Sequence, residues 1–164
     1  MKRFVFIVCV MLMGTNVMKA QSGLRLGANI GIPLGDVEEV SNFQAGADIA
    51  YMFGIADMLY VGPMIGYTRF FVEDIDNEIV DLDMEDPAFL PIAASGRIAL
   101  AQGFFFGTDL GYAVGLNDGN DGGFYYRPQI GYNFGKIGLI ASYSGISVDG
   151  DNFSSINLGI EFGL

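Results

Sequence analysis

The sequence contains no histidine. It therefore lacks the base of Ser-His and Asp-His hydrolases and the imidazole ligand that many metal sites use. The only cysteine, Cys9, lies in the N-terminal apolar run, so the rest of the chain has no disulfide framework and no cysteine metal site. These absences predict a protein that is not an enzyme and holds no cofactor.

The chain also lacks an apolar run of the about 18 residues that a membrane helix needs. Its longest run, from Phe4 to Met13, follows Lys2 and Arg3 and precedes a polar segment that ends at Ala20. This layout is typical of a secretory signal peptide. We predict a signal peptide at residues 1–20 and a single domain at residues 21–164.

Basic residues are scarce, with 8 Lys and Arg against 19 Asp and Glu, and this balance argues against a nucleic-acid partner. Hydrophobic residues, in contrast, make up 51% of the chain, and glycine occurs 24 times. No helix-length apolar run accounts for that hydrophobicity. The composition indicates an all-β protein that is more apolar than a soluble domain needs to be.

Apolar residues alternate with small or polar ones in eight segments. At the C-terminus, Leu158, Ile160 and Phe162 share one parity, and successive side chains of a strand point to opposite faces. The other segments are 24–32, 43–53, 59–71, about 89–101, 104–114, 124–134 and one that begins at 137. Alternating segments of this length, separated by turn residues, are typical of membrane barrels. We predict an all-β, eight-stranded antiparallel up-and-down transmembrane β-barrel.

The connections between these segments alternate in length. Long ones (33–42, 72–88, 115–123, 147–153) interleave with short ones (54–58, 101–103, 135–136). This alternation is typical of external loops and periplasmic turns, with both termini in the periplasm. Pro63, Pro91 and Pro128 fall inside strands, where we expect irregular pairing because proline has no N–H to donate.

Aromatic residues of the apolar parity fall near both ends of the predicted strands. The periplasmic set is Tyr51, Phe53, Phe104, Tyr132, Phe134 and Phe162, and the outer set is Phe43, Tyr67, Phe71, Phe124 and Tyr126. Two aromatic girdles are expected where a barrel crosses both membrane interfaces. A general preference of aromatic residues for strands would give the same distribution.

The other parity is mostly small or uncharged, with a few charges of both signs. These charges are Arg25, Asp48, Arg97, Asp109, Arg127 and Glu161. An eight-stranded lumen is filled by side chains, so we expect these residues to pair there and plug it. The alternatives are a narrow polar path for small solutes, or a soluble periplasmic lipocalin-like carrier with the apolar parity inside.

Most carboxylates fall in the predicted external loops, which suggests an anionic, solvated outer surface. Hard cations prefer oxygen ligands, and weak metal-site candidates are Asp74, Asp76 and Glu78 in one loop and Asp118 and Asp121 in another. The first group lacks the glycine and downstream glutamate of an EF-hand loop. The partners that fit are outer-membrane lipid, lipopolysaccharide bridged by divalent cations, and cationic surface partners, and we expect a monomer.

Four segments together resemble a known family. They are the Ala20-Gln21 leader end, Tyr60 to Tyr67, Arg127 to Tyr132, and the terminal Asn157 to Leu164. They resemble the small OmpA/OmpX-like outer-membrane β-barrels, especially the outer-membrane β-barrel domain common in Bacteroidetes, although Leu164 stands where Phe or Tyr is usual. The resemblance implies the outer membrane of a Gram-negative cell and often no known activity. We therefore expect a role in surface interaction or envelope integrity, carried by the acidic external loops.

Overall fold

The computed structural model describes residues 22–35, 41–72, 86–117, 119–148 and 151–164. The predicted signal peptide, residues 1–20, lies outside them. The strands are β1 (Gly23–Leu34), β2 (Ser41–Gly54), β3 (Leu59–Val72), β4 (Ala88–Ala99), β5 (Phe104–Gly115), β6 (Gly123–Phe134), β7 (Ile137–Val148) and β8 (Asp151–Gly163). A 3₁₀ turn, η2 (Ala101–Gly103), joins β4 to β5. No helix in these residues is long and apolar enough to cross a membrane.

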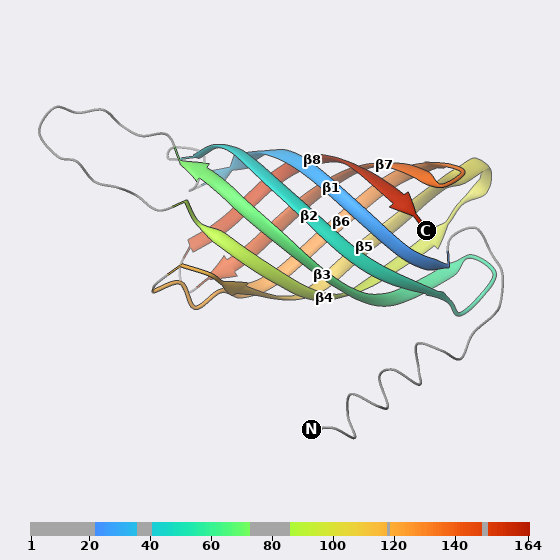
Figure 1. The fold of residues 1–164 in the computed structure, drawn as a ribbon, viewed down its shortest axis with the longest axis horizontal. Coiled ribbons are helices and arrows are strands. Elements are labelled where there is room, and N and C mark those ends of the chain that lie inside the picture. The colour runs from blue at the N-terminus through green and yellow to red at the C-terminus, as the bar shows by residue number, and fades with distance from the viewer. Residues whose placement is uncertain (1–21, 36–40, 73–85, 118, 149–150) are drawn as a thin grey trace, which may run out of the picture.

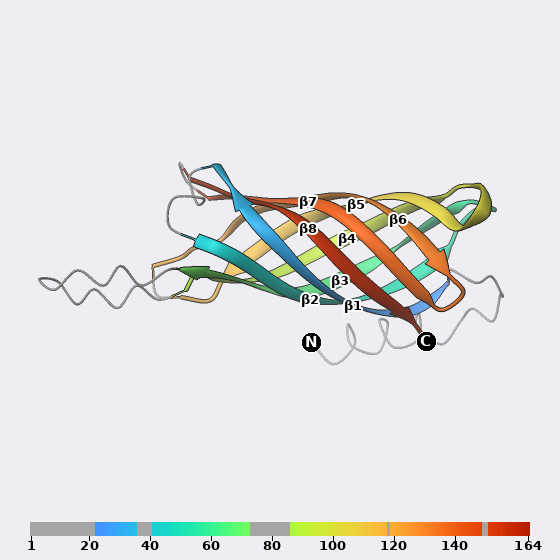
Figure 2. The same ribbon diagram turned by 90° about the horizontal axis from the view of Figure 1, so that it is seen from above.

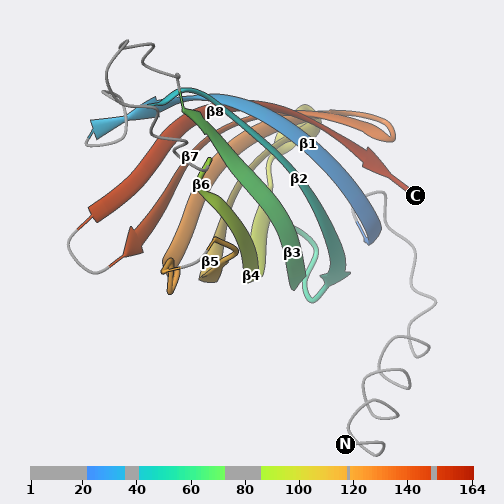
Figure 3. The same cartoon turned by 60° about the vertical axis from the view of Figure 1, so that its left-hand side comes forward.

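Each strand pairs antiparallel with the next, and β8 pairs with β1, so the sheet closes into a barrel. Figures 1 and 2 show the strands crossing the long axis of the barrel obliquely, as closure of a sheet requires. Figure 3 shows that the start of β1 and the C-terminus lie at the same end. The prediction of an eight-stranded antiparallel barrel is confirmed.

The alternating pattern decides which side chains face out. Apolar residues of the predicted parity are exposed on the outer surface, for example Ile32 at 69% and Leu158 at 67%. Side chains of the opposite parity lie inside, where Glu161 is 1% exposed. The sheet therefore presents an apolar outer face, the reverse of a soluble barrel.

Outward-facing aromatic rings contact each other near both ends of the barrel. At the short-turn end the pairs are Tyr51–Phe53, Phe104–Tyr132 and Tyr132–Phe134. At the other end they are Phe43–Phe71, Phe124–Tyr126 and Tyr126–Tyr143. This arrangement is the one expected of two interfacial girdles.

The last strand begins earlier than the alternation predicts. The predicted loop 147–153 is mostly ladder, because Ser147 pairs with Asn152 and Val148 with Asp151. Phe153 has the parity opposite to the apolar outer face and contacts Phe70 and Phe89 inside the barrel. An apolar residue that faces inward breaks the pattern, so the start of β8 was wrongly predicted.

The strand prolines interrupt the ladders without shifting their register. Two successive pairs are missing at Pro63 between β2 and β3, at Pro91 between β3 and β4, and at Pro128 between β6 and β7. The missing N–H of proline explains the gaps, and the pairing is irregular where we expected it.

Two glycines lie beneath aromatic rings of a neighbouring strand. A Cβ on Gly131 would meet the ring of Phe105, its cross-strand partner inside the lumen, and the backbone oxygen of Leu139. Gly145 lies in the same way beneath Tyr126. At both positions the absence of a side chain lets the ring lie flat on the sheet, which a larger residue would prevent.

This close approach predicts that Gly131→Val prevents efficient folding, because overpacking costs about 1–3 kcal/mol or more. The fraction of protein that runs as a compact band without boiling, after refolding into lipid vesicles, measures the effect. Gly96→Val is the matched control, since a Cβ at Gly96 would meet nothing within 4 Å. Equal folded fractions of the two variants would contradict the packing described for Phe105.

Candidate functional site

Glu161 is the centre of one ionic group inside the barrel. Arg97 on β4 donates to both of its oxygens, Nη1 to Oε1 at 2.8 Å and Nη2 to Oε2 at 2.6 Å. Arg25 on β1 donates from Nη1 to Oε1 at 2.7 Å. All three side chains are buried. One carboxylate on β8 therefore joins the two sides of the lumen.

Arg127 on β6 is the centre of a second group. Its Nε donates to Oδ2 of Asp109 on β5 at 2.7 Å, and its Nη1 donates to Oδ2 of Asp48 on β2 at 2.9 Å. Gln129 donates from Nε2 to the carboxylate of Asp109 at 3.2 Å. Asp109 is fully buried. This group ties three further strands across the lumen.

The two groups bring together all six predicted lumen charges, three arginines and three carboxylates. Their charges cancel, so the lumen keeps no net charge from them. Buried charges need partners, and each of these three guanidiniums has a carboxylate, although Arg97 Nε is buried without a hydrogen-bond acceptor. The Arg97 guanidinium also lies 4.8 Å from the centre of the Phe105 ring, a cation–π contact.

An uncharged polar layer occupies the lumen where β2, β7 and β8 face one another. The Ser155 hydroxyl donates to Gln44 Oε1 at 2.7 Å, and Asn157 Nδ2 donates to the Ser144 hydroxyl at 3.0 Å. All four residues are buried. The layer satisfies its own hydrogen bonds and binds these strands together.

Three phenylalanines fill the lumen at the long-connection end. Phe70, Phe89 and Phe153 contact one another with ring centroids 5.1 to 6.1 Å apart. Phe70 and Phe89 belong to a buried cluster that includes Tyr125 and Ile146, and the partly buried Phe153 packs against it. Their parity is opposite to that of the apolar outer face, and this break is the signal in the sequence that could have revealed them. The cluster makes this end of the lumen apolar and packed.

A second feature of this end is a hydrogen-bonded latch that comprises Arg69, Asp86 and Asn117. Arg69 donates from Nε and Nη2 to Oδ2 of Asp86 at 2.9 and 2.8 Å, and the Val72 N–H donates to Oδ1 at 2.9 Å. Asn117 accepts from the N–H of Ala88 at 2.7 Å and donates to the backbone oxygen of Asp86 at 3.1 Å. The latch joins the two sides of the β3–β4 connection at its base and fastens it to the β5–β6 connection.

Most of the predicted cation ligands lie outside the described residues. They are Asp74, Asp76, Glu78 and Asp118. Asp121 is exposed, and its backbone oxygen accepts from the Tyr112 hydroxyl at 2.9 Å. In the described ranges, no three His, Cys, Asp or Glu residues come together as metal ligands. The metal site stays a prediction.

No family model and no curated protein matches the chain. Its structure is similar to the outer membrane enzyme PagL, with a TM-score of 0.63 and 15% identity over 85% of this chain and 99% of that chain. It is similar to Ail, the attachment invasion locus protein of Yersinia pestis, with a TM-score of 0.62 and 15% identity over 88% of this chain and 100% of that chain.

A de novo designed transmembrane β-barrel is also similar, with a TM-score of 0.55 and 11% identity over 90% of this chain and 100% of that chain. The chain thus has the fold of the small eight-stranded outer-membrane β-barrels, as the sequence resemblance predicted. An enzyme and an attachment protein share this fold, so the fold does not decide whether the protein is an enzyme.

The burial of Glu161 predicts that Glu161→Gln destabilises the barrel strongly. Removing the carboxylate leaves two arginines in the lumen without their partner, a change that typically costs about 3–5 kcal/mol. Urea unfolding of the two proteins in lipid vesicles measures the change in the free energy of unfolding.

Arg69→Gln is the control, because its pair with Asp86 is partly exposed and exposed pairs contribute about 0–1 kcal/mol. If the free energy of unfolding fell by the same amount in both variants, the lumen pairs would contribute no more to stability than a surface pair.

Proposed function

We propose that the chain is a non-enzymatic bacterial outer-membrane protein with a closed lumen and an acidic external face that serves surface interaction or envelope integrity. The observation that supports it most is the inverted arrangement of side chains. Large apolar residues cover the outer surface, whereas the charged residues pair inside. Exposing that apolar outer surface to water would be unfavourable, whereas contact with the hydrocarbon core of a membrane would not be.

The same arrangement argues against a soluble lipocalin-like carrier. Such a carrier needs an apolar cavity and a charged outer face. Here Arg97, Arg127 and their carboxylates occupy the interior, and the aromatic cluster of Phe70, Phe89 and Phe153 packs above them. The same filling disfavours a narrow pore, because an ion would have to separate buried ion pairs and aromatic rings.

The external face is where the function would reside. The lumen charges cancel, and most of the remaining carboxylates belong to the long connections. Such a surface attracts cations and cationic partners, including divalent ions that bridge lipopolysaccharide phosphates. The Arg69–Asp86–Asn117 latch holds the base of the most acidic connection.

The comparisons with Ail and PagL do not extend to their ligands or chemistry. Ail has been solved with the heparin analogue sucrose octasulfate, a polyanion. The acidic loops of this chain would repel a polyanion, so we propose cationic partners instead. PagL is an enzyme, but this sequence has no histidine to serve as a base.

The proposal predicts that neutralising the β3–β4 connection weakens binding to cationic surfaces. We expect proteoliposomes carrying Asp74→Asn, Asp76→Asn and Glu78→Gln together to bind less to a polylysine surface at low salt. Each charge near such a surface is worth about 1 kcal/mol, so removing three should weaken binding on the order of 100-fold at low salt, and the loss should fade at high salt. Surface plasmon resonance measures it.

Asp57→Asn is the control, because Asp57 lies in the β2–β3 turn at the opposite end of the barrel. Equal binding to polylysine by proteoliposomes of the triple variant and by those of the parent would contradict the assignment of function to the external loops.

A further inference from the structure

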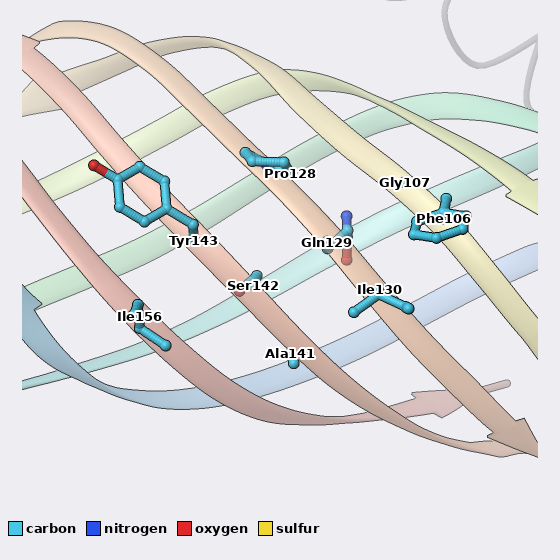
Figure 4. A pocket seen from close by; sticks show the side chains of 9 residues that line it. All are labelled: Phe106, Gly107, Pro128, Gln129, Ile130, Ala141, Ser142, Tyr143 and Ile156. Atoms are coloured by element: carbon cyan, nitrogen blue, oxygen red, sulfur yellow. The ribbon is translucent and has the colours of Figure 1, made fainter.

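The outer surface of the barrel carries a groove where Pro128 interrupts the β6–β7 ladder. It has a volume of about 430 Å³, and side chains of four neighbouring strands surround it, among them Phe106 on β5 and Ile156 on β8. Figure 4 shows Tyr143 at one side and Ala141 between the larger side chains. The small side chain of Ala141 leaves room among its larger neighbours.

A second groove of about 420 Å³ continues the first along β6 and β7. The two share Ile130 and Ala141, and the second extends to Phe104, Tyr132 and Leu139. Their lining is almost entirely apolar. We call these two adjoining shallow grooves the furrow; together they extend from the middle of the strands toward the short-turn end.

Of the basic residues in the described part of the chain, Lys136 is the one that lies toward the short-turn end of this furrow. Lys136 is exposed in the β6–β7 turn, and Leu139 follows it by three residues, roughly 10 Å along a strand. The other basic residues of the described part are engaged elsewhere: Arg25, Arg97 and Arg127 in the lumen, and Arg69 in the latch at the opposite end.

The end of β8 lies beside the Lys136 turn. The Lys136 backbone oxygen accepts from the N–H of Gly163 at 2.7 Å, and the Leu164 N–H donates to the backbone oxygen of Leu24 on β1 at 2.9 Å, at the opposite edge of β8. Lys136 thus places a positive charge in the turn at the short-turn end of β6 and β7, the end toward which the furrow runs and near which the rings of Phe104 and Tyr132 contact each other.

We propose that this furrow binds one anionic phospholipid of the periplasmic leaflet, with its phosphate on the Lys136 ammonium and one acyl chain along β6 and β7. The site rests on the membrane orientation proposed above. An elongated apolar groove fits a single acyl chain better than the broad contact of a second barrel, and Lys136, the one described cation toward its short-turn end, matches a single phosphate.

The absence of tryptophan allows a direct test, because one introduced tryptophan is the only indole. Phe104→Trp places it in the furrow, and Tyr51→Trp places it at the same end on β2, across the barrel. Each protein is refolded into phosphatidylcholine vesicles that contain a low, equal fraction of brominated phosphatidylglycerol or brominated phosphatidylcholine. Bromine quenches the indole only at close range.

In the Phe104→Trp variant, we expect the quenching to show phosphatidylglycerol enriched about fivefold over phosphatidylcholine next to the indole, which is the effect of one lysine near an anionic headgroup. In the Tyr51→Trp variant we expect no such enrichment. Lys136→Glu, which reverses the charge, and Ala141→Phe, which fills the furrow, should each abolish the excess. Ala94→Phe, an outward-facing substitution on β4, should leave it intact.

Equal quenching by the two lipids at Phe104→Trp would overturn the lipid site, as would an excess that persists in both Lys136→Glu and Ala141→Phe. Neither result would affect the proposed function, because both require a barrel already inserted in the vesicle. A parent protein that fails to insert at all would instead overturn the membrane assignment and this site with it.

Discussion

The pairing of buried charges across the lumen is the constraint on which the barrel depends. Glu161 holds Arg97 and Arg25, and Arg127 holds Asp109 and Asp48. Because side chains alternate along a strand, a slip of one residue would move such a charge from the lumen to the outer face. An arginine facing the middle of a bilayer costs about 2–4 kcal/mol and leaves its partner unpaired. The pairs thus stabilise one register and one inside-outside arrangement together.

The consequences for function follow from how the lumen is filled. Ion pairs, a polar layer and an aromatic cluster succeed one another along it, so the interior supports the barrel and offers little room for a solute. Any specific interaction then belongs to the outer surface of the protein. The acidic connections lie at one end, and the furrow with Lys136 lies toward the other. In the orientation proposed above, these two surfaces have opposite charge and would meet different partners, one outside the cell and one within the membrane.

Much of this could be predicted from the sequence, because a strand has a period of two. The parity of Ile160 and Glu161 places them on opposite faces of the sheet, and its repetition in eight segments predicts the barrel. The small number of charges on the second parity, and not the alternation itself, favoured the apolar face as the outer one. The partner of each charge could not be predicted, since Arg97 and Glu161 lie on β4 and β8, which are not neighbours in the sheet. Phe153 was missed because an inward apolar residue breaks the alternation, and that break also misplaced the start of β8. The latch depends on Asn117, which resembles any other polar loop residue in the sequence.

The inside-outside arrangement of the barrel can be tested by the gel mobility of the protein from washed outer membranes, with and without boiling in SDS. We expect the protein to stay in the membrane pellet and to migrate faster before boiling, because a closed barrel resists the detergent. Protein found in the soluble periplasmic fraction, with the same mobility before and after boiling, would contradict the inside-outside arrangement. The apolar parity would then have to line an internal cavity.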